Sequence, residues 1–182
     1  MNGMLKAVSA AVIVMGGGYI GGLLASRYSV RAVQLQQLSG AMEQLGFNIG
    51  FLKMPAATAL AETGRSGRGA ISSVLIYASE KITSGRTPAE AWEEAIRRYS
   101  GKLCLTDEDS EILSVFARSL GIGDVESELN NIRAASARLK LALSNAEAER
   151  DRMSRLTRGA GYLGGMLAAV IQIGRASCRE RV

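Results

Sequence analysis

Hydrophobic residues are concentrated in two uncharged stretches, one near each end of the chain. The first covers residues 7–25, 19 residues without a charge. As a helix they would extend about 28 Å, close to the ~30 Å hydrocarbon core of a bilayer. A cleaved signal peptide, with Lys6 as its basic region, is the alternative. The run is longer than a usual signal-peptide core, contains five glycines and is followed directly by arginines. We therefore predict an uncleaved transmembrane helix over 1–26.

The second uncharged stretch covers residues 159–174, and its 16 residues would extend only about 24 Å as a helix. It runs into the peptide IGRASCRERV, which is the translation of a common sequencing adapter. We therefore expect residues 173–182 to be an artefact, with a genuine basic tail as the alternative. On this interpretation 159–172 are part of a truncated C-terminal transmembrane helix that natively continues past Gln172.

Between these stretches, residues 27–158 carry apolar side chains at spacings of three to five residues, the period of amphipathic helices. We expect helices over 27–46, 55–64 and 70–84, further helices opening at Thr87, Thr106 and Asp124, and a loop over 64–69. Sustained period-two alternation is absent, so no sheet is predicted. The sequence predicts an all-α protein: an antiparallel bundle of about five to six helices, flanked by an N-terminal and a C-terminal transmembrane helix.

Several features refine these helices. The first is expected to bury a stripe that consists of Val30, Val33, Leu35, Leu38, Met42 and Leu45. Thr87 with Glu90, and Thr106 with the carboxylates that follow it, have the form of N-terminal capping motifs. The last helix has a coiled-coil seam at Leu129, Ile132, Ser136, Leu139, Leu143 and Ala146, with steps of three and four residues.

The positive charge of the chain is placed beside the membrane segments. The formal net charge is +5, but residues 27–158 hold 18 Lys and Arg against 16 Asp and Glu. A domain so close to neutral lacks the basic surface of a nucleic-acid-binding protein. The charges that we expect to orient the chain are Arg27, Arg31, Arg155 and Arg158, with Arg150 and Arg152 beside them. By the positive-inside rule, the central domain is cytoplasmic and both termini lie outside.

The residue types of the chain argue against catalysis. With no histidine, a Ser-His-Asp triad, a Cys-His dyad and a His-ligated metal are excluded. GGGYIG at 16–21 matches a dinucleotide-binding pattern only formally, because it lies in an apolar helix. The acidic run at 107–111 lacks the spacing of a calcium-binding loop. It is explained by residues that cap the start of a helix and residues on the solvent-exposed face of that helix. Cys104 is interpreted as a small buried residue. We predict no enzyme activity, no cofactor and no metal site.

Two groups of residues are candidates for packing or recognition. Within the membrane segments, three GxxxG pairs would let helix backbones approach closely: Gly17 with Gly21, Gly18 with Gly22, and Gly161 with Gly165. The general abundance of glycine in membrane helices is the alternative explanation. In the central domain, Trp92, Asp124 and Glu128 form a candidate partner surface, although a core position is the favoured alternative for Trp92.

Several sequence blocks follow one another in a telling order and spacing. They are RAVQLQQLSGAMEQL at 31–45, AWEEA at 91–95, LTDEDSEILSVFARSLG at 105–121, DVESELNNI at 124–132, AEAER at 146–150 and LGG at 163–165. In these blocks the chain resembles the stage III sporulation protein AB family of endospore-forming bacteria, over about residues 4–172.

The resemblance implies a structural role. The family is similar to the cytoplasmic platform domains of type II secretion and type IV pilus membrane proteins. The resemblance implies that the chain is a non-enzymatic, membrane-anchored component of the channel complex between mother cell and forespore, located in the mother-cell membrane. The implied partners are other stage III sporulation proteins, including the companion ATPase. The sequence leaves open whether the chain also forms a homo-oligomer. The alternative is a membrane-anchored signalling or adaptor module whose coiled-coil helix transmits a signal.

Overall fold

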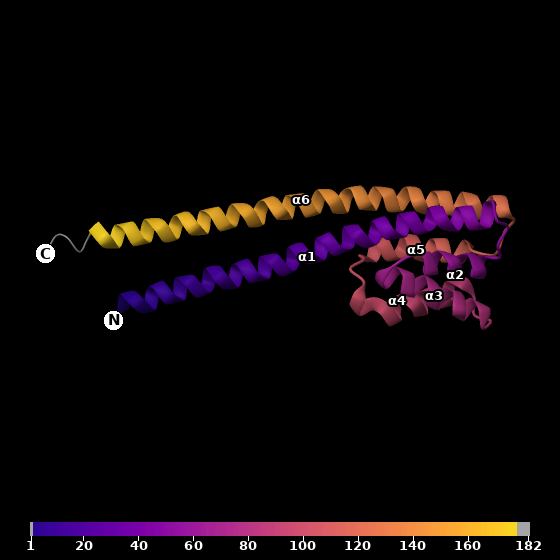
Figure 1. The fold of residues 1–182 in the computed structure, drawn as a ribbon, viewed down its shortest axis with the longest axis horizontal. Coiled ribbons are helices and arrows are strands. Elements are labelled where there is room, and N and C mark those ends of the chain that lie inside the picture. Colours follow the sequence, from indigo (N-terminus) through magenta and orange to yellow (C-terminus); the bar gives the residue numbers. More distant parts are fainter. Residues whose placement is uncertain (1, 178–182) are drawn as a thin grey trace. The chain divides into compact units, whose positions relative to one another are not determined.

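A computed structural model describes the backbone of residues 2–177 and the side chains of residues 26–153, 155 and 156. Every element in this part of the chain is helical (Figure 1). The elements are α1 (Asn2–Gly50), α2 (Ala56–Ser66), α3 (Gly69–Thr83), α4 (Pro88–Tyr99), a 3-10 helix (Ser100–Lys102), α5 (Asp107–Ser119) and α6 (Val125–Ser177). The all-α prediction is confirmed for the described residues.

The chain divides into two compact units. One unit comprises Met1–Tyr28 with Ala148–Val182, and the other comprises Ser29–Glu147. The second, here called the central unit, contains helices α2 to α5 and the adjoining halves of α1 and α6. It starts two residues after the start of the predicted domain, 27–158, and ends eleven residues before its end.

The two long helices pack antiparallel within the central unit. Lys140 of α6 pairs with Glu43 of α1 at 2.8 Å. Further along α1, a Cβ placed on Gly50 would lie 3.1 Å from the side chain of Leu129. Because the partner position on α6 falls as the position on α1 rises, the helices run in opposite directions. The absence of a side chain at Gly50 lets Leu129 approach the α1 backbone.

The core of the central unit is a single apolar cluster drawn from α1 to α6. The buried stripe of α1 consists of Ala32, Leu35, Leu38, Met42, Leu45 and Ile49. The predicted inclusion of Val30 and Val33 was wrong, since they are 42% and 50% exposed. Val33 precedes Leu35 by two residues and therefore lies about 160° around the helix from it. On α6 the seam prediction is confirmed at Ile132, Ser136, Leu139 and Ala146, which are buried.

The predicted helix starts are confirmed by their hydrogen bonds. At α4 the Glu90 N–H donates to Thr87 Oγ1 at 3.3 Å, and the Thr87 N–H donates to the Glu90 carboxylate at 3.2 Å. At α6 the Ser127 N–H donates to Asp124 Oδ1 at 3.0 Å. These side chains satisfy backbone donors that have no partner within the helix.

The predicted loop over 64–69 is shorter than expected. Residues 64–66 still belong to α2, and only Gly67 and Arg68 separate α2 from α3. A Cβ on Gly64 would lie 2.7 Å from Ile76 Cγ1 and 3.1 Å from the Ile76 backbone nitrogen. Gly64 therefore marks a close approach of α2 and α3, and not flexibility of the chain.

In the described part of the chain, no helix offers an apolar stretch long enough to cross a membrane. The predicted transmembrane segments, 1–26 and 159–172, fall almost wholly on residues whose side chains lie outside the described ones. The same holds for all six glycines of the predicted GxxxG pairs and for Arg158. Residues 178–182 of the predicted artefact are also outside the described part.

Candidate interaction surfaces

The charged residues nearest the start of the central unit form a buried ion pair. Arg31 Nε lies 2.8 Å from Asp109 Oδ2, and Arg31 also donates to Asp109 Oδ1 at 3.1 Å. The side chains are 12% and 1% exposed. This two-point contact joins α1 to the first turn of α5. The predicted cap role of Asp109 is confirmed, but its predicted place on a solvated face was wrong, because its side chain is buried against Arg31. The role of Arg31 as an orientation charge stays a prediction.

Asp109 also closes the cap of α5. Its carboxylate accepts the Thr106 N–H at 2.9 Å, and its own N–H donates to Thr106 Oγ1 at 3.3 Å. Burial raises the pKa of Asp109, but the hydrogen bonds from Arg31 and Thr106 outweigh it, so that the pKa lies below the ordinary value of 3.8. The carboxylate is therefore charged across the physiological pH range, which suits a structural anchor and not a proton-transfer group.

Gln34, one helical turn further along α1, holds the segment before α5. Its amide donates to the Lys102 carbonyl at 2.8 Å and accepts the Cys104 N–H at 2.7 Å. The thiol of Cys104 is half-buried, consistent with the packing role predicted for it. These bonds satisfy backbone groups of an irregular segment that has no helical partners of its own.

A cluster of charged and aromatic side chains joins α3 to α4. Glu94 accepts a hydrogen bond from the Tyr77 hydroxyl at 2.7 Å and lies 2.8 Å from Lys81 Nζ. Lys81 and Arg98 both lie about 5 Å from the centre of the Tyr77 ring, at 5.1 and 5.0 Å. The contact with Lys81 lowers the pKa of Glu94. The groups of this cluster are partnered with one another, so it fixes α3 against α4.

The opposite end of the central unit exposes large apolar side chains. We call this set the apolar end, and it consists of Phe47, Phe51, Leu52, Ile122 and Val125. Phe51 and Ile122 are 74% and 79% exposed. The rings of Phe47 and Phe51 stack on each other, with centroids 5.2 Å apart. Stacking of one exposed ring on another leaves most of both rings in contact with solvent.

Helix packing brings the two parts of the apolar end together. Gly50 at the end of α1 lies against Leu129 of α6. Val125 lies one turn before Leu129 and therefore shares its face of α6, beyond the end of α1 in this antiparallel pair. The turn between α5 and α6 is held in place because the Gly121 N–H donates to the Glu128 carboxylate at 2.8 Å. Sequence periodicity could not locate this surface, because its members lie in segments 70 residues apart.

The predicted partner residues divide between surface and core. Asp124 is exposed beside the apolar end. Glu128 is half-buried and accepts the Gly121 N–H. Trp92 is only 1% exposed and lies edge-on to Phe116 at a centroid distance of 6.2 Å, so it belongs to the core and offers no surface to a partner. Its indole N–H has no hydrogen-bond partner.

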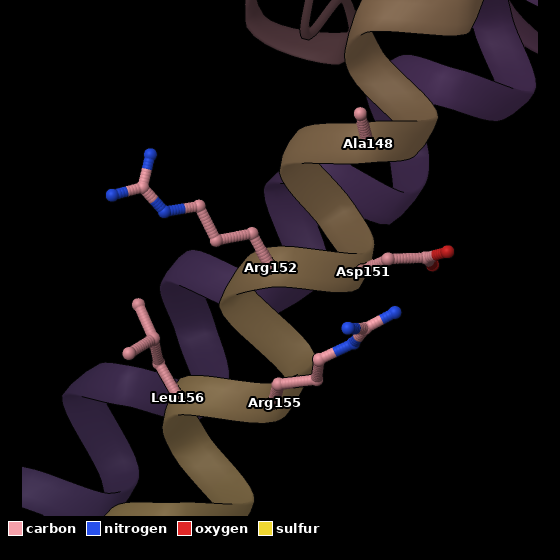
Figure 2. Close-up of a pocket in the computed structure, with 5 residues that line it drawn as sticks. All are labelled: Ala148, Asp151, Arg152, Arg155 and Leu156. Carbon is pink, nitrogen blue, oxygen red and sulfur yellow. The ribbon is translucent and has the colours of Figure 1, made fainter.

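Further along α6, basic side chains line a recess of about 530 Å³. Figure 2 shows Arg152 and Leu156 projecting to one side of α6, and Asp151 and Arg155 to the other. Arg152 and Arg155 are exposed, as is Arg27 on α1. The described residues that line this recess all belong to α6. A second recess, of about 260 Å³, lies between α1, α2 and α3 and is lined mainly by small and polar residues such as Gln37, Gly67 and Arg68.

Among the described residues, no cluster of acidic or cysteine side chains is suited to hold a metal ion. The described part of the molecule thus consists of a helical bundle joined by ion pairs, with an apolar surface at one end. Such an arrangement defines the class of all-α helical bundle proteins.

The chain belongs to the stage III sporulation protein AB family, whose family model matches residues 6–173. It is similar to stage III sporulation protein AB of Bacillus subtilis, with 27% identity over 169 residues that cover 92% of this chain and 99% of the relative. A solved structure of a stage III sporulation protein AB superposes with a TM-score of 0.62 at 24% identity, covering 68% of this chain and 98% of that one. The solved structure confirms the shared fold, and the family predicted from the sequence blocks is confirmed.

Proposed function

We propose that this chain is a non-enzymatic, membrane-anchored platform of the stage III sporulation channel complex between mother cell and forespore. Membership of the family, matched over residues 6–173, supports a role in sporulation. The observation that carries the platform role is the apolar end, because a folded unit that exposes stacked aromatic rings is suited to contact another protein. The charged side chains of the described core pair with one another, so they are suited to stabilise the fold.

The proposed anchors are two transmembrane helices, over 1–26 and over 159–172 with its native continuation. The uncharged stretches 7–25 and 159–174 support them. We place the chain in the mother-cell membrane that faces the forespore, with the central unit in the cytoplasm and both termini outside. The exposed arginines Arg27, Arg152 and Arg155 support this orientation. The GxxxG glycines are proposed to pack these helices, within one chain or between chains.

The proposed partners are the other stage III sporulation proteins, above all the companion ATPase of the same operon. Affinity purification of the full chain from sporulating cells, in a mild detergent, tests this. The ATPase and other operon products should be retained, while a tagged two-span membrane protein of unrelated function should not retain them. If no operon product accompanies the chain, the platform function is contradicted.

A signalling module with a transmitting coiled coil is less well supported. The seam of α6 that suggested it includes Ile132, Leu139 and Ala146, which are buried in the core of the central unit. A seam that packs within its own unit is not available to pair with a second signalling helix.

A further inference from the structure

The apolar end carries acidic groups that indicate what it binds. We propose that it is a docking surface for a helix of a partner protein that presents apolar side chains together with lysine or arginine. The inference rests on the proposed platform function, because it names the face of the platform that meets its partner and the chemistry of that partner.

The first support is the exposure of the apolar end. Single exposed apolar residues are ordinary, but large ones gathered on one end of a folded unit mark interaction sites. Phe47, in the last turn of α1, stacks on Phe51, which directly follows the helix, and the two rings give a firm aromatic surface. The backbone beneath is fixed, because the Met54 N–H donates to the Asn48 carbonyl at 3.1 Å and closes the end of α1. A rigid aromatic surface loses little conformational entropy on binding.

The second support is the charge around the apolar end. Residues 46–56 and 121–130 together hold the three carboxylates of Asp124, Glu126 and Glu128, against Lys53 as their one cation. Arg118, in the last turn of α5, raises the cations to two, and carboxylates still predominate. Asp124 and Glu126 are exposed and available to a ligand. An apolar surface beside exposed carboxylates is complementary to an apolar face with basic side chains.

The same charges disfavour the other occupants of such a surface. A bilayer rich in anionic lipid would be repelled by Asp124 and Glu126, since such membranes recruit basic segments. In a two-fold contact between copies of this chain, the same patch would face itself and bring like charges together. A partner helix that carries both apolar and basic side chains is complementary to the apolar residues and to the carboxylates of this surface.

The test uses the full chain in neutral phosphatidylcholine nanodiscs and each purified operon product as the binding partner. Three variants are compared with the wild type: Ile122→Glu on the apolar end, Leu141→Glu as the matched control, and Glu126→Lys for the charge. Leu141 is also strongly exposed, at 65%, but lies more than four turns along α6 from Val125. Because Ile122 and Leu141 point into solvent, both glutamate variants should fold, which circular dichroism checks.

We expect the operon product that binds to lose roughly tenfold or more in affinity with Ile122→Glu, as for the loss of one buried aliphatic side chain. Leu141→Glu should change affinity less than about twofold. Glu126→Lys and added salt should both weaken binding. Cross-linking through a photoreactive residue at position 122 should reach a peptide that contains both apolar and basic residues.

Several results would overturn the proposal. If an operon product binds and Ile122→Glu leaves its affinity unchanged, the docking surface is wrong while the platform function stands. If Glu126→Lys strengthens binding, the partner is not basic. If sedimentation shows a dimer that is lost with Ile122→Glu, the surface binds a second copy of the chain. If the protein binds anionic vesicles and Ile122→Glu abolishes this binding, the surface binds lipid. If no operon product binds at all, the platform function fails and this inference fails with it.

Discussion

One end of the central unit buries charged side chains, whereas the other end exposes large apolar ones. Near the start of the unit, a charged pair is taken out of water: Asp109 is buried against Arg31 and bonded to the cap of α5. At the other end, where α1 stops and α6 begins, the large apolar residues Phe51 and Ile122 are left in water. About 20 residues of α1 separate these regions, which is roughly 30 Å of helix.

This difference between the two ends indicates that the buried ion pair stabilises the fold, whereas the exposed apolar end serves recognition. A buried ion pair is tolerated because it is fully hydrogen-bonded, and its loss leaves an uncompensated charge. An exposed aromatic pair contributes little to the free energy of unfolding, since it buries little area. Changes at the first end should therefore destabilise the fold, whereas changes at the second should alter only binding. The predictions below test this division, with unfolding followed by the fluorescence of Trp92, the single tryptophan of the chain.

The largest effect is expected at the ion pair. Asp109→Ala should lower the free energy of unfolding by about 3 kcal/mol, because it removes the carboxylate that pairs with Arg31 and one of the two hydrogen bonds in the cap of α5. Urea unfolding of the full chain in neutral detergent measures this. Glu108→Ala, at the neighbouring exposed carboxylate, should cost less than about 1 kcal/mol. Equal losses in the two variants would show that burial of the pair does not matter.

The same pair predicts the pH dependence of stability. The pKa of Asp109 is lower in the folded protein than its ordinary value of 3.8. Its contribution is therefore fully present above that value and is lost as the pH falls through the lower folded-state pKa. Unfolding midpoints between about pH 5 and pH 2 should fall less steeply in Asp109→Asn than in the wild type. Parallel curves would mean that another carboxylate controls acid unfolding.

The next effect concerns the close approach of α2 and α3. Gly64→Ala should destabilise the protein by about 1–3 kcal/mol, because a Cβ there would lie 2.7 Å from Ile76. Gly40→Ala is the control, since a Cβ on Gly40 meets nothing within 4 Å. In the interior of α1 it should stabilise by about 0.5–1 kcal/mol. Thermal unfolding of both variants gives the sign of each change.

A smaller effect is expected at the turn beside the apolar end. Lys53 has a φ of 53°, in the left-handed region that non-glycine residues rarely adopt. Lys53→Gly should therefore raise the free energy of unfolding by about 1 kcal/mol or less. Lys53→Ala is the control, because it removes the charge and keeps the strain. If alanine stabilises as much as glycine, the charge and not the backbone is responsible.

The smallest effect on stability is expected at the apolar end itself. Ile122→Ser should change the free energy of unfolding by less than about 0.5 kcal/mol, because the side chain is already exposed. A loss of 2 kcal/mol or more would show that the apolar end supports the fold and would remove the contrast between the two ends.

Local signals in the sequence were sufficient for much of the fold. The helix starts at Thr87 and Asp124 were predictable, because capping depends on residues within one turn. Where a long-range contact decides the outcome, prediction failed. Val33 fits an apolar spacing as well as Leu38 does, and only the position of the neighbouring helices decides which of them is buried. Likewise, the partner of Arg31 lies 78 residues away.

The candidate surface was harder to predict than the fold. Asp124 was identified as a surface residue. For Trp92 the favoured core position is confirmed over the partner-surface alternative, which sequence alone could not exclude because a tryptophan is suited to both. Phe51 and Ile122 gave no signal in sequence, since each resembles an ordinary core residue. Only the packing of α1 against α6 places them on one exposed end.

The most direct test compares spore formation in the native host with the chain carrying Ile122→Glu or Leu141→Glu, at equal amounts of protein in the membrane. If the apolar end is a recognition surface and not part of the core, Ile122→Glu should lower the yield of heat-resistant spores, because it disrupts a contact worth roughly tenfold or more in affinity. Leu141→Glu should sporulate as the wild type does. Equal and normal spore yields from both variants would contradict the account.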